Sequence, residues 1–296
     1  MSERSECSES GHGVVTAVQH IRRMRGGAQS HLMRCSDNKF YVVKFRNNPQ
    51  GVKILANEFA FSHLARVLNL SVPSPKIIEV SDWLVQQSPA LSIWIPPNST
   101  TPCDSGLQYG SEYAISPLHG RVLDWISSEM LMRTRNRTEF AGMFVLDKWA
   151  CNVDDRQTVF WRRNTERKYS ACFIDHGYCF GAGDWDFRDH PMCGAYSQGV
   201  VYRDITGWES FDPWLSELER MDETRIWDAV SSIPPIWYSS DWSSLERLAE
   251  TLILRRGKVR QLIEQFRDLP QRPFPMWGQN KARRATVEDP AAMGAG

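Results

Sequence analysis

Two short acidic segments, each delivered by an apolar run, constrain this chain more than any other feature. The first spans residues 144–157 and the second spans residues 172–177. Their aspartates and asparagine are Asp147, Asn152, Asp154, Asp155 and Asp175. Apolar residues on both sides of an Asp predict that a rigid element presents its carboxylate at the edge of a site. Carboxylate and amide oxygens in such a position suit a divalent cation and a phosphate group.

Composition narrows the class of protein. With 296 residues, the chain can form one large domain or two modest ones. Lys plus Arg equals Asp plus Glu, at 35 each, and this neutral balance argues against a dedicated nucleic-acid binder. The seven cysteines contain no C-x-x-C spacing, which disfavours a zinc or redox site and is typical of reduced thiols in a cytoplasmic protein. Neither a signal peptide nor a membrane span is expected.

The order of elements predicts an α+β protein of two lobes. Residues 14–96 are expected to form a β-rich N-lobe with one prominent helix, and residues 114–277 a mainly helical C-lobe. The Pro-, Ser- and Gly-rich residues 97–113 are expected to be a hinge. Residues 1–13 and 278–296 have the composition of disordered tails.

The periodicity of apolar residues places the expected elements within these lobes. Strands are expected at residues 14–21, 32–35, 40–45, 77–80, 83–86, 91–95 and 169–174. Helices are expected at residues 52–68, 122–132, 137–149, 211–221, 223–233 and 245–266.

Taken as a set, the polar residues suit phosphoryl transfer. A small-residue turn between the first two strands offers backbone N–H groups to phosphate oxygens. Lys44 on the following strand can reach phosphates, and Glu58 on the helix can hold that lysine by an ion pair. One Asp can orient or deprotonate a hydroxyl, while an Asn and a second Asp hold Mg²⁺. The turn consists of Gly26, Gly27, Ala28, Gln29 and Ser30.

In this order, the motifs resemble those of the HipA-like kinase domain family, and more distantly the phosphatidylinositol-4-kinase and protein-kinase type of fold. The resemblance covers about residues 14–265. The motifs that carry it are Arg25–His31, Tyr41–Phe45, Asn57–Glu58, Asn152–Gln157 and Ile174–Gly177. It implies a bilobal kinase that uses ATP and Mg²⁺ and acts on a Ser or Thr hydroxyl of a protein. By the same resemblance, Lys44 binds phosphate, Glu58 is its partner, Asp175 binds the metal, and the catalytic aspartate is Asp154 or Asp155.

One departure leaves the catalytic register open. In such kinases an Asn stands five residues after the catalytic Asp, whereas here Val159 or Phe160 occupies that position. Asp147 and Asn152 do satisfy the spacing, so Asp147 is the alternative catalytic residue. We favour Asp154 or Asp155, with Asn152 as a compensating metal ligand.

The departure also keeps alternative functions open. The first is a pseudokinase, or a nucleotide-binding or protein-interaction module without turnover. The second is a small-molecule or lipid kinase, although the chain has no basic amphipathic helix of the kind that binds membranes. Taken singly, each polar residue is better explained as a turn, a strand-edge lysine or a surface ion pair. The tryptophans between residues 185 and 242 are expected to pack in the core, with a protein-binding surface as the alternative.

Overall fold

The structure of the protein is a computed structural model that describes residues 13–279. Its fold divides the chain into two compact units. Unit 1 contains the described residues up to Gln50 together with Ser74–Tyr113, and unit 2 contains Gly51–Pro73 and the described residues from Ala114 onward. The expected tails at residues 1–13 and 278–296 fall almost entirely outside the described residues.

Unit 1 is built on a closed five-stranded barrel with the strand order β1-β2-β3-β7-β4. Neighbouring strands are antiparallel except for β1 and β4, which are parallel. A ribbon of β5 and β6 and the short helix α2 complete the unit. The bounds are β1 Val15–Arg23, β2 His31–Cys35, β3 Phe40–Lys44, β4 Pro75–Val80, α2 Asp82–Gln87, β5 Ser92–Ile95, β6 Ser99–Pro102 and β7 Gly106–Glu112.

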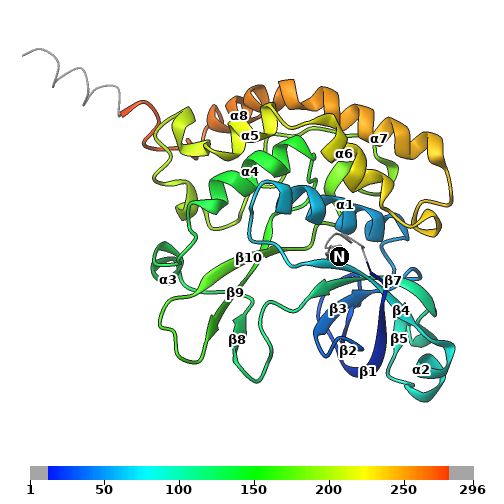
Figure 1. Ribbon diagram of the computed structural model, residues 1–296. Coiled ribbons are helices and arrows are strands. Elements are labelled where there is room, and N and C mark those ends of the chain that lie inside the picture. Colours follow the sequence, from blue (N-terminus) through cyan, green and yellow to red (C-terminus); the bar gives the residue numbers. More distant parts are fainter. Residues whose placement is uncertain (1–12, 280–296) are drawn as a thin grey trace, which may run out of the picture. The chain divides into compact units, whose positions relative to one another are not determined.

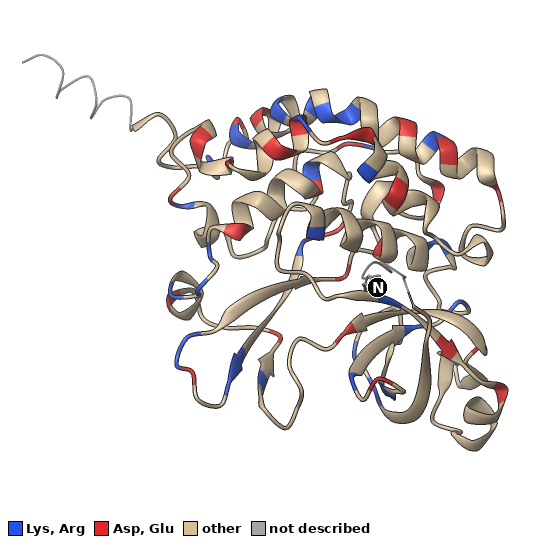
Figure 2. Ribbon diagram, viewed as in Figure 1, with Lys and Arg blue, Asp and Glu red and all other residues tan. Residues whose placement is uncertain are grey.

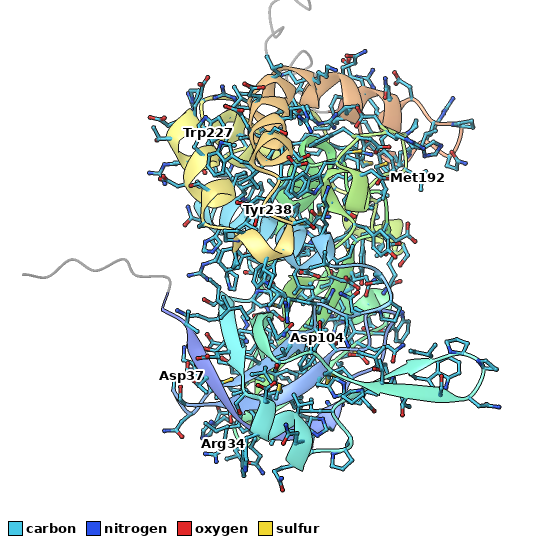
Figure 3. The ribbon with its side chains drawn as sticks, turned by 90° about the vertical axis from the view of Figure 1, so that its right-hand side faces the viewer. Arg34, Asp37, Asp104, Met192, Trp227 and Tyr238 are labelled. Carbon is cyan, nitrogen blue, oxygen red and sulfur yellow. The ribbon has the colours of Figure 1, made fainter. Side chains whose placement is uncertain are left out.

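The barrel interior is the core of unit 1. Met33, Tyr41 and Val43 have no exposed surface and pack with Ile78 and Phe45. The hydroxyl of Tyr41 donates a hydrogen bond to Asp37 at 2.7 Å, which supplies a partner for the one polar atom of this buried ring. Figure 3 labels Asp37 and Arg34, which lie at the β2–β3 turn and on β2.

Unit 2 combines helices with a three-stranded sheet of order β10-β9-β8. In Figure 1, α7 lies above α6 and α6 above α1, and these neighbours are in contact. The helix α4 packs against α5 and α8. The bounds are α1 Lys53–Val67, β8 Gly120–Leu123, α3 Ser128–Met132, α4 Glu139–Trp149, β9 Gln157–Arg163, β10 Ser170–Ile174, α5 Trp214–Glu219, α6 Glu223–Ser231, α7 Trp242–Arg255 and α8 Val259–Arg267. Short 3-10 turns lie at Cys179–Asp184, Gly199–Tyr202, Trp208–Phe211, Pro235–Trp237 and Arg256–Lys258.

Aromatic rings form the core of unit 2 beside α4. The ring of Phe144 lies 4.7 Å from that of Phe266 and 5.2 Å from that of Tyr202. The tryptophans, expected in the core, divide between core and surface: Trp237 is fully buried, whereas Trp242 is 54% exposed. Figure 3 labels Trp227, which is half-buried on α6. Figure 2 shows acidic and basic residues interspersed along α7 and α8.

The expected α+β architecture is confirmed, but the expected hinge at residues 97–113 is not a linker. It contains β6 and β7, and β7 lies in the barrel between β3 and β4. A Cβ on Gly110 would lie 2.4 Å from Ile78 Cγ1, so this glycine permits close packing in the barrel. The prominent helix α1, expected in the N-lobe, belongs to unit 2, where it packs on α6.

Three other expected elements also differ. Residues 83–86, expected as a strand, lie in α2, because the Ser81 hydroxyl accepts a hydrogen bond from Leu84 N–H and caps a helix. Residues 122–132, expected as one helix, contribute to β8 and to the short α3. The long helix expected at residues 245–266 is two helices, α7 and α8, separated by a 3-10 turn that contains Gly257, a poor helix former. No strand was expected at residues 157–163, which form β9.

Candidate functional site

The first acidic segment begins on α4, which is buried along most of its length. The helix ends where Cys151 adopts a positive φ of 48°, a conformation that cannot continue a right-handed helix. Asn152 N–H then donates to Asp147 O at 3.0 Å and closes the last turn. The chain leaves as a loop, residues 152–156, and enters β9.

Asp147 has no exposed surface, and its carboxylate binds two residues of this loop. It accepts hydrogen bonds from Arg156 Nε at 2.9 Å, from Arg156 Nη2, and from Asn152 Nδ2 at 3.0 Å. The two-point contact with Arg156 is the geometry of a strong carboxylate–guanidinium pair. Burial lowers the pKa of Arg156, but the Asp147 carboxylate raises it by more, so the net shift is upward. Burial likewise raises the pKa of Asp147, and Arg156 opposes that shift.

Arg156 also reaches the second acidic segment. Its Nη1 donates to Ile174 O at 2.8 Å, to Asp175 O at 3.3 Å and to His176 Nδ1 at 2.9 Å. The His176 ring stacks on Phe61 of α1, with ring centres 4.5 Å apart. Arg156, which is only 3% exposed, therefore joins both acidic segments to α1. The alternative that it belongs to a surface ion-pair cluster is wrong.

Asp154 and Asp155 lie on the exposed side of the loop. Asp154 N–H donates to Asn152 Oδ1 at 3.2 Å, and Asp155 N–H donates to Asp154 Oδ1 at 2.8 Å. The backbone of the loop is fixed by Gly194 N–H, which donates to Asp154 O at 3.2 Å. These two carboxylates are thus held on an ordered loop while their side chains face solvent.

A strap formed by residues 191–195 covers the loop. Buried Lys148 donates to Pro191 O at 2.6 Å and to Cys193 O at 2.7 Å, and desolvation lowers the pKa of this lysine to about 8. Gly194 has a φ of +67°, and a Cβ there would lie 2.2 Å from Asp147 Cβ. Only glycine fits this close approach, so the strap seals Asp147 from solvent.

Asp175 is the first residue after β10 and is partly buried. Its φ of +60° is uncommon for a residue other than glycine, although Asp and Asn tolerate it better than most. Such backbone conformations concentrate at functional sites, where the surrounding structure maintains them. Gly177 follows two residues later, and a Cβ there would lie 2.5 Å from Ile54 Cγ2 on α1.

Asn57 of α1 fixes the loop beyond Gly177, a role that the sequence did not indicate. Its Nδ2 lies within hydrogen-bond distance of the carbonyl oxygens of Gly177, Cys179 and Ala182, at 2.7, 3.0 and 3.0 Å. Its Oδ1 accepts from Trp185 Nε1 at 2.7 Å. The side chain is fully buried, so all of its polar atoms are satisfied by this loop.

The residues expected to bind nucleotide divide between the two units. Lys44 ends β3 in unit 1 and is buried, and Glu58 lies on α1 in unit 2 and is 2% exposed. Their pairing therefore stays a prediction. In the turn of residues 26–30, Gly26 has a φ of +119° and is exposed. The Gln29 side chain is hydrogen-bonded to the backbone of β5: it donates to Trp94 O at 2.9 Å and accepts from Trp94 N–H at 2.7 Å.

The positions expected to carry a second metal ligand lie in β9. Val159 pairs with Cys172 of β10, Phe160 is fully buried, and neither side chain has an atom that binds a metal ion. Within residues 13–279 there is no cluster of three or more His, Cys, Asp or Glu side chains arranged to bind a metal ion. A Mg²⁺ site of the kinase type needs only one or two protein carboxylates, because phosphates and water complete its shell. Asp175 and the neighbouring loop fit that requirement.

None of the helices in the described part of the chain combines the length and apolarity needed to cross a membrane. A search of curated proteins found no match.

Three solved structures that are similar to this chain are kinases. The proinflammatory kinase CtkA of Helicobacter pylori matches with a TM-score of 0.52 and 13% identity, over 87% of this chain and all of CtkA. A Golgi casein kinase matches with a TM-score of 0.47 and 13% identity, over 87% of this chain and 72% of that one. The same kind of kinase with Mn/ADP bound matches with a TM-score of 0.43 and 12% identity, over 88% and 74%. The similarity to CtkA shows that the fold is protein-kinase-like.

A family model adds what fold similarity alone does not. The model of the HipA-like kinases matches residues 17–262, nearly the range over which the motifs resemble that family. This range includes both acidic segments and the barrel strand that carries Lys44. The chain belongs to the HipA-like kinase family.

Proposed function

We propose that this protein is an ATP- and Mg²⁺-dependent phosphotransferase that acts on a Ser or Thr hydroxyl of a protein. One observation carries the proposal. The buried Asp147–Arg156 pair joins the loop of Asp154 and Asp155 to the segment that begins with Asp175. A single rigid network thus supports all three carboxylates expected to act on phosphate and hydroxyl, which is the preorganisation that phosphoryl transfer requires.

Asp155 is our first choice for the residue that orients the acceptor hydroxyl and receives its proton. It is exposed and lines a groove of about 590 Å³ in unit 2. Asp154 Oδ1 accepts a hydrogen bond from Asp155 N–H, which favours a role for Asp154 in fixing the loop rather than in proton transfer. Asp147 has no exposed surface, which supports a positioning role rather than contact with substrate. A carboxylate contributes to proton transfer only from within hydrogen-bond reach of the hydroxyl.

Nucleotide binding is assigned on the motifs of the family. The backbone N–H groups of residues 26–30 and the Lys44 ammonium would hold phosphates, with Glu58 orienting Lys44. Asp175 would hold Mg²⁺, with Asn152 beside it, and the ion would supply neutralisation of phosphate charge. Asn152 Oδ1 already accepts from Asp154 N–H, so we expect Asp175 to be the stronger ligand.

A second function has one observation in its favour. Val159 and Phe160 lie in β9, where an active kinase of this type would have an Asn metal ligand. A protein that binds nucleotide but does not transfer phosphate would show this change. Binding and transfer therefore need separate tests.

Thermal unfolding with and without Mg-ATP tests binding. At 100 times its dissociation constant, a ligand stabilises by about 2.7 kcal/mol, which for a chain of this size raises Tm by about 5 to 11 °C. We expect the shift to require Mg²⁺ and to be lost in Asp175→Asn. Asp228→Asn, which changes an exposed carboxylate on α6, is the matched control and should retain it. A normal shift in Asp175→Asn would show that the site assignment is wrong.

Transfer of the γ-phosphate tests catalysis. We expect Asp155→Asn to bind Mg-ATP as the wild type does but to lose transfer, by the 10²- to 10⁴-fold that general acid–base groups typically supply. Asp154→Asn should retain more activity than Asp155→Asn. A wild-type protein that binds Mg-ATP and transfers nothing would favour the binding module.

A further inference from the structure

One side chain ties the small-residue turn of residues 26–30 to the ribbon of β5 and β6. Gln29 Nε2 donates a hydrogen bond to Trp94 O at 2.9 Å, and Gln29 Oε1 accepts one from Trp94 N–H at 2.7 Å. Both partners are backbone groups of one residue of β5, so the amide pairs with β5 as the backbone of a neighbouring antiparallel strand does. The turn and the ribbon both lie in unit 1.

This tether depends on the identity of residue 29. The contact needs a donor and an acceptor side by side at the end of the side chain, and a carboxamide supplies both. A glutamate in this place would accept from Trp94 N–H but could not donate to Trp94 O, and a lysine could donate but not accept. An asparagine is one methylene shorter and would not reach the same two groups.

The backbone of the turn adopts a conformation that needs such support. Gly26 has a φ of +119° and Gln29 a φ of +50°, and the left-handed region is unfavourable for a residue with a side chain. Two backbone hydrogen bonds close the turn, from Gln29 N–H to Gly26 O at 3.1 Å and from Met24 N–H to Ser30 O at 2.8 Å. The tether holds the one residue of the turn that is both strained and not glycine. It therefore stabilises this conformation over the many others that a Gly-Gly segment can adopt.

In this conformation the turn offers backbone donors. Gly26 and Gly27 are exposed, and among residues 13–279 their N–H groups and that of Ala28 have no hydrogen-bond acceptor, whereas Gln29 N–H is used within the turn. A Cβ on Gly27 would lie 3.0 Å from Gln50 Nε2, so a larger residue at this position would crowd the Gln50 amide. Successive N–H groups in a fixed turn are the groups that bind phosphate oxygens.

The Gln29 side chain itself is not available for that contact, because its oxygen and its nitrogen are both bonded to Trp94. Its effect on a ligand must therefore act through the turn. A ligand that binds a mobile segment loses affinity to the cost of ordering that segment, whereas a segment held in its bound conformation avoids most of this loss.

We propose that Gln29 is a positioning residue for the nucleotide, an inference that rests on the function proposed above. By tying the turn to β5, Gln29 holds the N–H groups of residues 26–28 in an arrangement that binds the phosphate oxygens of Mg-ATP. It does so without contacting the nucleotide, and the ribbon of β5 and β6 thereby supports the nucleotide site.

The dissociation constant of Mg-ATP, measured by isothermal titration calorimetry, tests the tether from both of its ends. Gln29→Ala removes the side chain, and Trp94→Pro removes the backbone N–H from which Gln29 accepts. We expect each variant to raise the dissociation constant by about fivefold or more, a typical energetic coupling between two parts of a protein. The double variant should bind no more weakly than the weaker single variant, because both changes remove the same contact.

Two control variants separate the tether from other effects. Trp94→Ala keeps both backbone groups and removes only an exposed side chain, and Gln87→Ala changes an exposed amide on α2 of the same unit. Both should bind Mg-ATP as the wild type does. Wild-type affinity in Gln29→Ala overturns the proposal. A loss in Gln29→Ala with wild-type affinity in Trp94→Pro also overturns it, because Gln29 would then contact the ligand directly.

Amide hydrogen exchange in the nucleotide-free protein provides a readout that a general loss of stability would not reproduce. In Gln29→Ala, residues 24–30 should exchange faster than in the wild type, while β3 and β7 of the barrel exchange at unchanged rates. Equal exchange of the turn in both proteins overturns the tether.

Failure of this inference and failure of the proposed function give different results. A wild-type protein that binds Mg-ATP no better than its variants, with clear binding in all of them, overturns the inference alone. A wild-type protein that does not bind Mg-ATP overturns both.

Discussion

The substitution Asp147→Asn tests whether the buried ion pair holds the two acidic segments together. The change preserves side-chain shape but removes the charge that balances Arg156, and both residues are buried. Asp147 accepts from three donors, two on Arg156 and one on Asn152. An amide in its place keeps one oxygen and turns an NH₂ group toward one of those donors. One donor then loses its partner, which alone costs about 1 to 3 kcal/mol.

The uncompensated guanidinium adds to that cost. Removing one partner of a buried pair typically destabilises by about 3 to 5 kcal/mol. We therefore expect the free energy of unfolding to fall by about 3 to 5 kcal/mol and Tm to fall by about 6 to 20 °C. The assay is chemical and thermal unfolding monitored by circular dichroism. The double variant Asp147→Leu/Arg156→Met should be less destabilised than Asp147→Asn, because it leaves no buried charge.

An exposed pair provides the control. Arg260 and Glu219 also make a two-point contact, at 2.6 and 2.8 Å, but their side chains are 44% and 31% exposed. Glu219→Gln should cost less than about 1 kcal/mol. If Asp147→Asn costs no more than Glu219→Gln, the reasoning that assigns a structural role to the buried network is refuted.

Three further predictions concern other parts of the fold. Asn57→Ala should lower the free energy of unfolding by about 2 to 4 kcal/mol, because it leaves the carbonyl groups of Gly177 and Cys179 without this donor. An unchanged free energy of unfolding would show that Asn57 does not stabilise the loop beyond Gly177. Gly194→Ala should lower Tm and impair transfer, because its Cβ would collide with Asp147; an unaffected variant would show that the strap is adaptable. Burial lowers the pKa of His31 to about 4 from its usual 6.5. Between pH 4 and pH 6.5, His31 is therefore protonated in the unfolded chain but neutral in the folded protein. Stability should therefore fall as pH drops from about 6.5 to 4, and His31→Gln should show a shallower dependence; equal slopes in both proteins would contradict this assignment.

The local chemistry of the chain predicted much of the fold. Alternating β-branched and aromatic residues located β3, and a continuous apolar run located α4 and β10, because these patterns depend only on neighbours in the sequence. The predictions that were wrong concern segments whose local sequence is compatible with two structures. Gly110 read as part of a flexible hinge, but it serves close packing within the barrel. Residues 83–86 read as a strand, although Ser81 caps a helix there.

The sequence predicted the acidic residues of the candidate site but not the residues that hold them in place. Asp154, Asp155 and Asp175 were selected because carboxylates that follow apolar runs suit metal and phosphate chemistry, and because they match motifs of the family. Asn57 and His176 stood within motifs of the family, but their supporting roles were not predicted, because an amide or an imidazole fixes a loop only when distant segments meet around it. Arg156 stood within the acidic motif, but its burial depends on α1, β10 and the strap of residues 191–195.

The sequence by itself determined the residue types, their order and the kinase family, because motif identity and spacing are properties of the chain. Only the tertiary structure decided which carboxylates face solvent and which is sealed. Asp147 and Asp155 lie eight positions apart and have the same chemistry. One is enclosed by Arg156, Asn152 and Gly194, and the other lines an open groove. The physical reason is that desolvation and ion pairing depend on the groups that surround a carboxylate in space, and some of these, such as Gly194, come from distant parts of the chain.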